Sequence, residues 1–181
     1  NRIGVMGFSR GGAVAFRAAV EPLLRAVVKS DVKFALHIPV YAACNQVYWS
    51  DKLTKAPLLN LVGAADDYTY AAPCETLTQK YAATGTAVRS INYPKAHHAW
   101  DAMYPVMSLS NVTSAYQCGI LRWDIGTWEI TSEKTGEKIP SDKLNAFFNA
   151  CMTRGVHVGR NESAFMQSRE DVQKFVREVF K

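Results

Sequence analysis

The sequence predicts an α/β protein in which a mostly parallel sheet is flanked by helices. Two patterns carry this prediction. Short apolar runs of strand length alternate with longer segments whose apolar residues recur at helical spacing. This alternation is typical of parallel strands joined by crossover helices. A chain of 181 residues is long enough for one domain and short for two, so we expect residues 1–181 to form a single domain.

The first hundred residues contain four predicted strands and two predicted helices. The strands are expected at residues 2–8, 34–43, 57–64 and 87–93. The helices are expected at residues 9–28, where Pro22 must end or kink the helix, and at residues 72–84. Gly85 follows the second helix at the position where glycine commonly ends a helix.

The pattern changes after His98. We interpret residues 108–161 as an insertion, because this segment is too small to bury a core of its own. It contains a predicted hairpin around residues 134–136 and a short helix that aligns Leu144, Phe147, Phe148 and Cys151 on one face. The segment could form a rim or lid. An amphipathic helix closes the chain, and Ser168 and Asp171 have the spacing of a capping box at its start.

Composition excludes several classes of function. The net charge is +5, but Lys and Arg are scattered and are not interleaved with aromatic residues, so no nucleic-acid surface is predicted. No apolar run is long enough to span a membrane, and no signal peptide is visible. We expect no membrane interaction.

The four cysteines allow two disulfides or four free thiols. Cys118–Cys151 is the favoured pair, because both residues flank the polar insertion, and Cys44–Cys74 would then join neighbouring loops. No C-x-x-C pair occurs, which disfavours a zinc site. If both disulfides form, a periplasmic or secreted protein is expected; otherwise the protein is cytoplasmic.

Gly7-Phe8-Ser9-Arg10-Gly11 is a G-x-S-x-G sequence between an apolar strand and a helix rich in small residues. In this context the serine is predicted to lie on a sharp strand-to-helix turn, with its hydroxyl held above the sheet. Glycines two positions away would avoid collisions across the turn. The backbone N–H of Arg10 would then serve as an oxyanion donor at the helix N-terminus.

A serine nucleophile needs a base and an acid, which are expected after later strands. The strand at residues 57–64 leads into Asp66 and Asp67. We favour Asp66 as the acid, while Asp67 could cap the next helix. The strand at residues 87–93 leads into His97 and His98; His98 is preferred as the base and His97 is the alternative. His37 and His157 fit no such position and are interpreted as structural.

The stretches "RIGVMGFSRGG", "GAADDYTYAAPC" and "YPKAHHAWD" resemble the three catalytic blocks of the dienelactone hydrolase family, within the α/β-hydrolase superfamily. The resemblance covers about the first hundred residues and, loosely, the last helix. It implies a partial α/β-hydrolase fold and a carboxylic ester hydrolase with Ser9 as nucleophile, His98 as base and Asp66 as orienting acid. Enzymes that give the family its name carry cysteine at the position of Ser9, so a broader esterase is expected.

The resemblance also implies strands and helices before residue 2, including a second oxyanion donor. Residues 2–8 are too apolar for an exposed edge strand, so a missing N-terminal segment or a second chain is expected to pack on them. Alone, such a fragment would show weak or no turnover.

The leading prediction is therefore a serine esterase that acts on a small-molecule ester and needs no metal or cofactor. A peptidase on the same fold and a non-catalytic binding module of hydrolase ancestry are the alternatives. Trp100 and Tyr41 are candidate substrate-binding residues, with core packing as the competing interpretation; Tyr68 has the same status as Tyr41.

Overall fold

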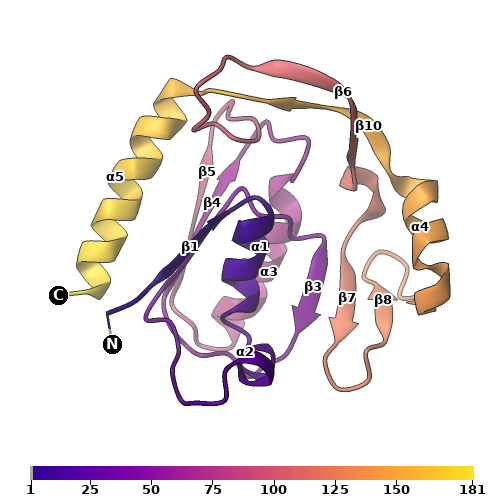
Figure 1. Cartoon of the computed structure of the whole chain (residues 1–181), viewed down its shortest axis with the longest axis horizontal. Coiled ribbons are helices and arrows are strands. Elements are labelled where there is room, and N and C mark those ends of the chain that lie inside the picture. The colour runs from indigo at the N-terminus through magenta and orange to yellow at the C-terminus, as the bar shows by residue number, and fades with distance from the viewer. Residues whose placement is uncertain (1) are drawn as a thin grey trace.

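The computed structural model describes residues 2–181 and contains a central sheet with helices on both faces (Figure 1). Four parallel strands lie in the order β1, β2, β4, β5. Their bounds are Val5–Phe8 for β1, His37–Val40 for β2, Leu58–Gly63 for β4 and Val88–Tyr93 for β5. The predicted mostly parallel sheet is thereby confirmed, with strands that are shorter than the apolar runs that predicted them.

Two hydrophobic clusters hold the helices against this sheet. On one face, α1 (Arg10–Arg17) and α3 (Ala71–Ala83) contribute Phe16, Leu77 and Tyr81 to a cluster that includes Leu58 of β4. On the other face, α5 (Glu162–Val179) contributes Phe175. Strand β4 is fully buried because it lies between both layers. Its continuous apolar run is the sequence signature of a strand covered on both faces.

The first predicted helix is two helices. After α1, the chain turns and α2 (Glu21–Val27) begins, with Pro22 in its first turn. Proline is well tolerated there because the first N–H groups of a helix have no partner within the helix. Pro22 therefore starts a second helix instead of only ending the first.

The chain between β5 and α5 forms the outer part of the molecule. Strands β6 (Met107–Ser114) and β10 (Thr153–Val158) pair antiparallel and cross over the carboxyl ends of the central strands (Figure 1). A second sheet joins β3, β7, β8 and β9. These strands span Gln46–Trp49, Leu121–Asp124, Ile130–Ser132 and Lys138–Ile139. The turn between β8 and β9 is the predicted hairpin, with Gly136 at a φ of 73°.

This outer sheet is tied to the rest of the chain through β3, which lies in the first half of the sequence and pairs in parallel with β7. Two short 3₁₀ helices, η1 (Tyr116–Cys118) and η2 (Ser141–Lys143), precede β7 and α4. Helix α4 (Leu144–Cys151) packs Leu144, Phe147 and Phe148 against the sheet, as its spacing predicts.

Both predicted disulfides are present. Cys44 is bonded to Cys74 and Cys118 to Cys151, and residues 2–181 contain no free cysteine. The first joins the segment after β2 to α3, and the second joins η1 to α4.

The capping box predicted at Ser168 is wrong. Helix α5 begins six residues earlier, and the side chain of Asn161 caps it by accepting a hydrogen bond of 3.0 Å from the backbone N–H of Ala164. Ser168 lies inside the helix, where its hydroxyl donates to the carbonyl of Phe165. No helix within residues 2–181 has both the length and the apolar character needed to cross a membrane.

Candidate active site

Ser9 lies on the sharp turn between β1 and α1. Its φ is 55° and its ψ is −115°, a region that residues with a side chain rarely occupy. The backbone N–H of Ser9 donates to the carbonyl of Val40 at 2.9 Å, which fixes the turn against the neighbouring strand. Strained backbone of this kind persists only where the surrounding structure enforces it, and it concentrates at functional sites.

The glycines around Ser9 have different roles. A Cβ on Gly7 would lie 2.0 Å from the carbonyl oxygen of Gly11, so the turn cannot close with a larger residue there. A Cβ on Gly12 would lie 2.8 Å from the Cβ of Ala42, where α1 packs against the chain after β2. Gly11 has open space at this position. The expectation that Gly11 must also lack a side chain is therefore wrong.

The structure brings Ser9, His98 and Asp66 together. The Oγ of Ser9 lies 3.0 Å from Nε2 of His98, and Nδ1 of His98 lies 3.0 Å from Oδ2 of Asp66. The three residues come from the turns after β1, β5 and β4, whose carboxyl ends meet at one edge of the parallel sheet. The side chain of Asp66 is fully buried, and that of His98 is 7% exposed.

Asp66 is held by its own loop. Its Oδ1 accepts the backbone N–H groups of Tyr68 at 2.9 Å and Thr69 at 2.7 Å. The hydroxyl of Thr69 lies 3.0 Å from Oδ2 of Asp66 and 2.9 Å from Nδ1 of His98. A buried carboxylate that accepts several hydrogen bonds is kept in one orientation. Thr69 is a site residue that the sequence analysis missed; the only signal was its position three residues after the acid.

Two tyrosine rings enclose the imidazole of His98. The ring centroids of Tyr41 and Tyr68 lie 4.8 and 4.9 Å from that of His98. Tyr41 is buried, and its hydroxyl donates to Oδ1 of Asp101 at 2.7 Å. Burial, and then this hydrogen bond to Asp101, raise the pKa of Tyr41 far above its ordinary value. Tyr41 thus lies behind the imidazole as a packing residue.

Trp100 belongs to the core. Its side chain is 1% exposed, its ring packs against Tyr41 and Tyr93, and its Nε1–H donates to the hydroxyl of Ser168. Neither Trp100 nor Tyr41 lines the cavity beside Ser9. The structure therefore corrects the substrate-binding prediction for both in favour of core packing.

A cavity of about 240 Å³ opens beside Ser9. It is lined by the segment after β2, by the loop that follows Asp66, and by residues in or directly after β6 and α4. The residues that line it include Arg10, Asn45, Tyr68, Thr113, Phe148 and Met152. Of the two candidate tyrosines, Tyr68 lines the cavity and Tyr41 does not; Tyr70 also lines it. Residues 108–161 supply part of the wall, which is the position expected of a rim.

Helix α1 points its N-terminus at this cavity. The helix begins at Arg10, directly after Ser9, so the N–H groups of its first turn have no carbonyl partner within the helix. Such a helix end favours negative charge through its dipole and its free N–H groups. The backbone of Arg10 is therefore placed where an oxyanion could be bound.

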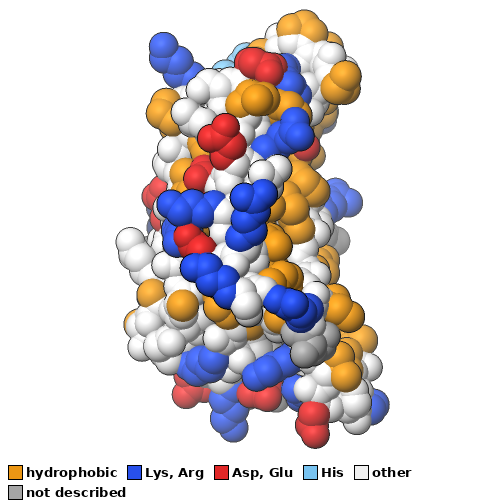
Figure 2. All heavy atoms as spheres, turned by 90° about the vertical axis from the view of Figure 1, so that its left-hand side faces the viewer, with side chains coloured by type: hydrophobic (Ala, Val, Ile, Leu, Met, Phe, Trp, Pro, Cys, Tyr) orange, Lys and Arg blue, Asp and Glu red, His pale blue; other side chains and the backbone are white. Residues whose placement is uncertain are grey.

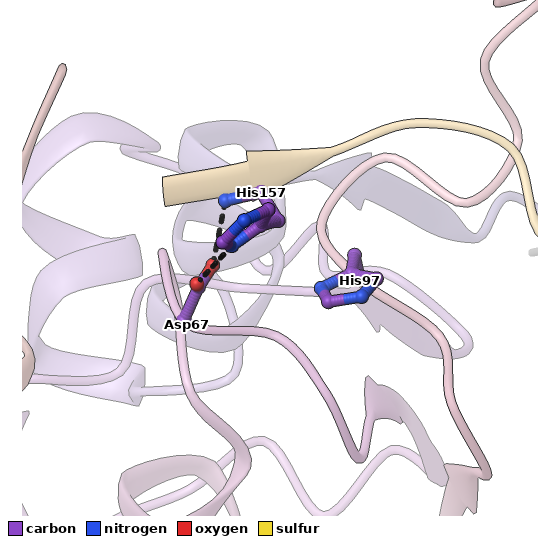
Figure 3. Close-up of side chains that lie close together, drawn as sticks. All are labelled: Asp67, His97 and His157. Carbon is purple, nitrogen blue, oxygen red and sulfur yellow. Dashed lines mark hydrogen bonds and ion pairs between the residues drawn. The ribbon is translucent and has the colours of Figure 1, made fainter. Parts of the chain in front are cut away.

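The other acidic and histidine candidates lie elsewhere. Asp67 does not cap α3, whose N-cap is Tyr70; it pairs with His157 of β10 at 2.7 Å. His97 lies beside this pair (Figure 3), and it is His98 that contacts Ser9. His37 is completely buried, and its Nδ1–H donates to the carbonyl of Ala15 at 3.0 Å. Asp67, His97 and His157 are the residues here that could hold a metal ion.

The parallel sheet, the helices on both faces and the serine on its strained turn are the features of the α/β-hydrolase fold. The profile of the dienelactone hydrolase family matches residues 1–117, so the chain belongs to that family. No curated protein is detectably similar to this chain in sequence.

Two solved structures are similar to part of the chain. MGS-M1, an α/β-hydrolase enzyme from a Medee basin deep-sea metagenome library, is 17% identical with a TM-score of 0.43 over 54% of this chain. A protein of Klebsiella pneumoniae subsp. pneumoniae MGH 78578, provisionally described as a dienelactone hydrolase, is 22% identical with a TM-score of 0.36 over 53% of this chain. The similar region spans 40% of the length of each of these structures.

Proposed function

We propose that this protein is a serine hydrolase that cleaves carboxylic esters through an acyl-enzyme. The observation that carries the proposal is the pair of 3.0 Å contacts that link Ser9 to His98 and His98 to Asp66. Nucleophile and base within hydrogen-bond reach, with the base oriented by a third group, is the arrangement that activates a serine hydroxyl.

In the first half of the reaction, Oγ of Ser9 attacks the ester carbonyl carbon while Nε2 of His98 removes the hydroxyl proton. Asp66 accepts the Nδ1–H of His98, which keeps Nε2 free to act as the base and stabilises the imidazolium that forms. Negative charge develops on the carbonyl oxygen, and the backbone N–H of Arg10 is the proposed donor to it. The C–O bond to the alcohol then breaks, and the proton on Nε2 goes to the leaving alkoxide.

In the second half, water replaces the alcohol. His98 takes a proton from this water as its oxygen attacks the acyl carbon of the Ser9 ester. The bond between that carbon and Oγ breaks, Oγ recovers its proton from Nε2, and the carboxylic acid leaves. These steps use only side chains, backbone and water.

The substrate is proposed to be a small molecule. The cavity of about 240 Å³ lies just below the range of about 300–1,000 Å³ typical of pockets for drug-sized ligands. Its lining combines aromatic and polar side chains, which suits a short acyl group with some polar substitution.

We also propose that a further protein segment packs against β1. Among residues 2–181, β1 is paired on one side only, by β2. Met6 and Phe8 are 43% and 44% exposed, and a groove of about 250 Å³ runs from them to α5. Figure 2 shows the corresponding band of hydrophobic side chains beside the charged surface. An additional strand or chain would cover this apolar edge.

The two disulfides support an oxidising compartment, the periplasm or the outside of the cell, as the proposed location.

The test of the activity is labelling by a fluorophosphonate probe, which reacts with activated serines. We expect the wild-type chain to be labelled, and labelling to be lost in Ser9→Ala and in His98→Ala. Ser110→Ala is the matched control, because Ser110 is an exposed serine on β6 and its loss should leave labelling unchanged.

Turnover of a short-chain p-nitrophenyl ester and of the matching p-nitroanilide then separates an esterase from a peptidase. Faster cleavage of the anilide would overturn the ester assignment. A folded wild type that neither reacts with the probe nor cleaves either substrate, also when supplied with the segment that covers β1, would favour a non-catalytic binding module.

A further inference from the structure

A second cluster of ligating side chains lies next to the proposed catalytic residues but does not include them. It consists of Asp67, His97 and His157 (Figure 3). Asp67 follows Asp66 in the loop after β4, His97 precedes His98 in the loop after β5, and His157 lies on β10. Three segments that are distant in sequence therefore converge here.

The three residues are close enough to bind one ion. One ligand atom from each lies within 4.8 Å of the other two. Asp67 and His157 are already in direct contact, with 2.7 Å between Oδ2 and Nδ1. The second carboxylate oxygen of Asp67 accepts the backbone N–H of His157 at 2.8 Å, which holds the carboxylate in place. The ring centroid of His97 lies 5.4 Å from that of His157.

The ring of His97 gives a separate reason to expect a bound cation. Its Nδ1 is buried and has no hydrogen-bond partner among residues 2–181. The ring presents its edge to Asp67 and His157 (Figure 3). A buried nitrogen without a partner is costly and calls for a ligand that the protein itself does not supply. A cation bound between the three side chains would be such a ligand.

Two imidazole nitrogens and one carboxylate oxygen are a donor set suited to Zn²⁺. Zinc binds both at about 2.0–2.2 Å, so that neighbouring ligands of a tetrahedral ion lie about 3.3 Å apart. The 2.7 Å contact must therefore open slightly and the contacts to His97 must shorten. Both shifts are small for side chains that are partly exposed, since His157 is 48% and Asp67 39% exposed.

We propose that Asp67, His97 and His157 form a binding site for Zn²⁺ or a similar divalent transition metal, with water as the fourth ligand. The ion takes the place of the proton between Nδ1 of His157 and Oδ2 of Asp67, and His157 binds it as a neutral imidazole that carries its proton on Nε2. Its effect is to fasten β10 to the two loops that carry Asp66 and His98. This site is separate from the proposed triad, in which both nitrogens of His98 are already engaged.

The test uses Co²⁺ as a spectroscopic substitute for zinc and does not depend on enzyme activity. Addition of Co²⁺ to the purified wild-type chain should produce visible d–d absorption typical of a four-coordinate ion, saturating at one ion per chain. Zn²⁺ should abolish this absorption by competition. Zinc should also raise the melting temperature of the wild type.

Two variants remove a ligand and two serve as controls. His97→Ala and His157→Gln should each weaken Co²⁺ affinity by about 100-fold or more. Removing a residue that only hydrogen-bonds to a metal ligand costs about 10- to 100-fold, and a ligand itself should cost more. His157 is half-exposed, so its replacement should not prevent folding. His98→Ala tests binding at the triad, and Asp142→Asn tests binding to an exposed carboxylate; neither should change the affinity.

Three outcomes would overturn the proposal. The first is a wild type that shows no such absorption at micromolar to millimolar Co²⁺. The second is affinity that stays unchanged in His157→Gln. The third is affinity that is lost in His98→Ala, because that would assign the ion to the triad.

Discussion

The hydroxyl of Thr69 lies 2.9 Å from Nδ1 of His98, on the side of the imidazole that faces away from Ser9. The same hydroxyl lies 3.0 Å from Oδ2 of Asp66 and 2.9 Å from the carbonyl of Tyr41. With a single proton, Thr69 can donate to only one of these acceptors at a time. When the Thr69 hydroxyl donates to the carbonyl of Tyr41, the hydroxyl oxygen can accept the Nδ1–H of His98 together with Asp66. Thr69 thereby limits rotation of the His98 ring.

We therefore expect Thr69→Val to lower kcat about 3- to 10-fold, which corresponds to the loss of one hydrogen bond of about 0.5–1.5 kcal/mol. KM should change little, since the isosteric side chain preserves the shape of the cavity. Thr69→Ser should restore most of kcat. The measurement is steady-state ester hydrolysis over a range of pH. An effect on KM alone would show that Thr69 acts on substrate and does not position His98.

A matched pair of glycine variants tests the turn at Ser9. Gly7→Ala should destabilise the fold by about 3 kcal/mol or more, because its Cβ would lie 2.0 Å from a backbone oxygen. Gly11→Ala, four residues later, has open space at the Cβ and should be neutral or stabilising by up to about 1 kcal/mol, since alanine favours helix. Urea denaturation followed by circular dichroism measures both. Equal midpoints for the two variants would contradict the geometry of the turn.

The stability of the fold should depend on pH through His37. Burial is the main cause that lowers the pKa of His37 from 6.5 to about 4, against an opposing hydrogen bond to the carbonyl of Ala15. In the unfolded chain this residue binds a proton below pH 6.5, while in the folded chain it stays neutral until about pH 4. The free energy of unfolding should therefore fall by about 3 kcal/mol as pH drops from 6.5 to 4, and this contribution should be constant above 7.

Chemical unfolding at a series of pH values checks this dependence, and His37→Gln should flatten it. The imidazole signal of His37 in an NMR titration gives the same answer without a variant. A titration midpoint near 6.5 for the folded protein would refute the predicted pH dependence.

Each disulfide should contribute similarly to stability. The bridges close loops with sequence separations of 30 and 33 residues. Chain entropy then predicts a loss of about 3.5 kcal/mol for either Cys44→Ala/Cys74→Ala or Cys118→Ala/Cys151→Ala. The first pair should also alter ester turnover, because Cys44 lines the cavity beside Ser9 and Cys118 does not. Thermal melts and kinetics of the two double variants make the comparison, and identical turnover would show that the Cys44 bridge does not shape the cavity.

The buried elements and the proposed catalytic residues could be predicted from the sequence, because each has a recognisable local pattern. The buried strand β4 was visible as an apolar run, and α4 as a one-sided stripe. Ser9, Asp66 and His98 each follow a strand of one parallel sheet, so their proximity could be expected from topology alone. The sequence left free thiols open, but it favoured the pair Cys118–Cys151 because both residues flank the insertion, and both pairs are present.

The remaining features depend on contacts that no local pattern encodes. Strand β3 is four residues long and finds its partner β7 more than seventy residues later. Ser168 has the spacing of a cap, but Asn161 takes that role because the helix starts as soon as β10 ends. The sequence left Trp100 open between substrate binding and core packing, and its burial against Tyr41, Tyr93 and Ser168 of α5 decides for the core.

Strand β10 does more than complete a pair with β6. The backbone of Val158 bridges to that of His98, and the N–H of Gly159 donates to the carbonyl of His98 at 2.9 Å. Val158 and Gly159 lie beyond residues 1–117, the part of the chain that the family profile matches. The proposed base is thus anchored by a segment outside the matched part of the chain, so substitutions in β10 should change the rate of the proposed hydrolysis while Ser9, His98 and Asp66 stay unaltered.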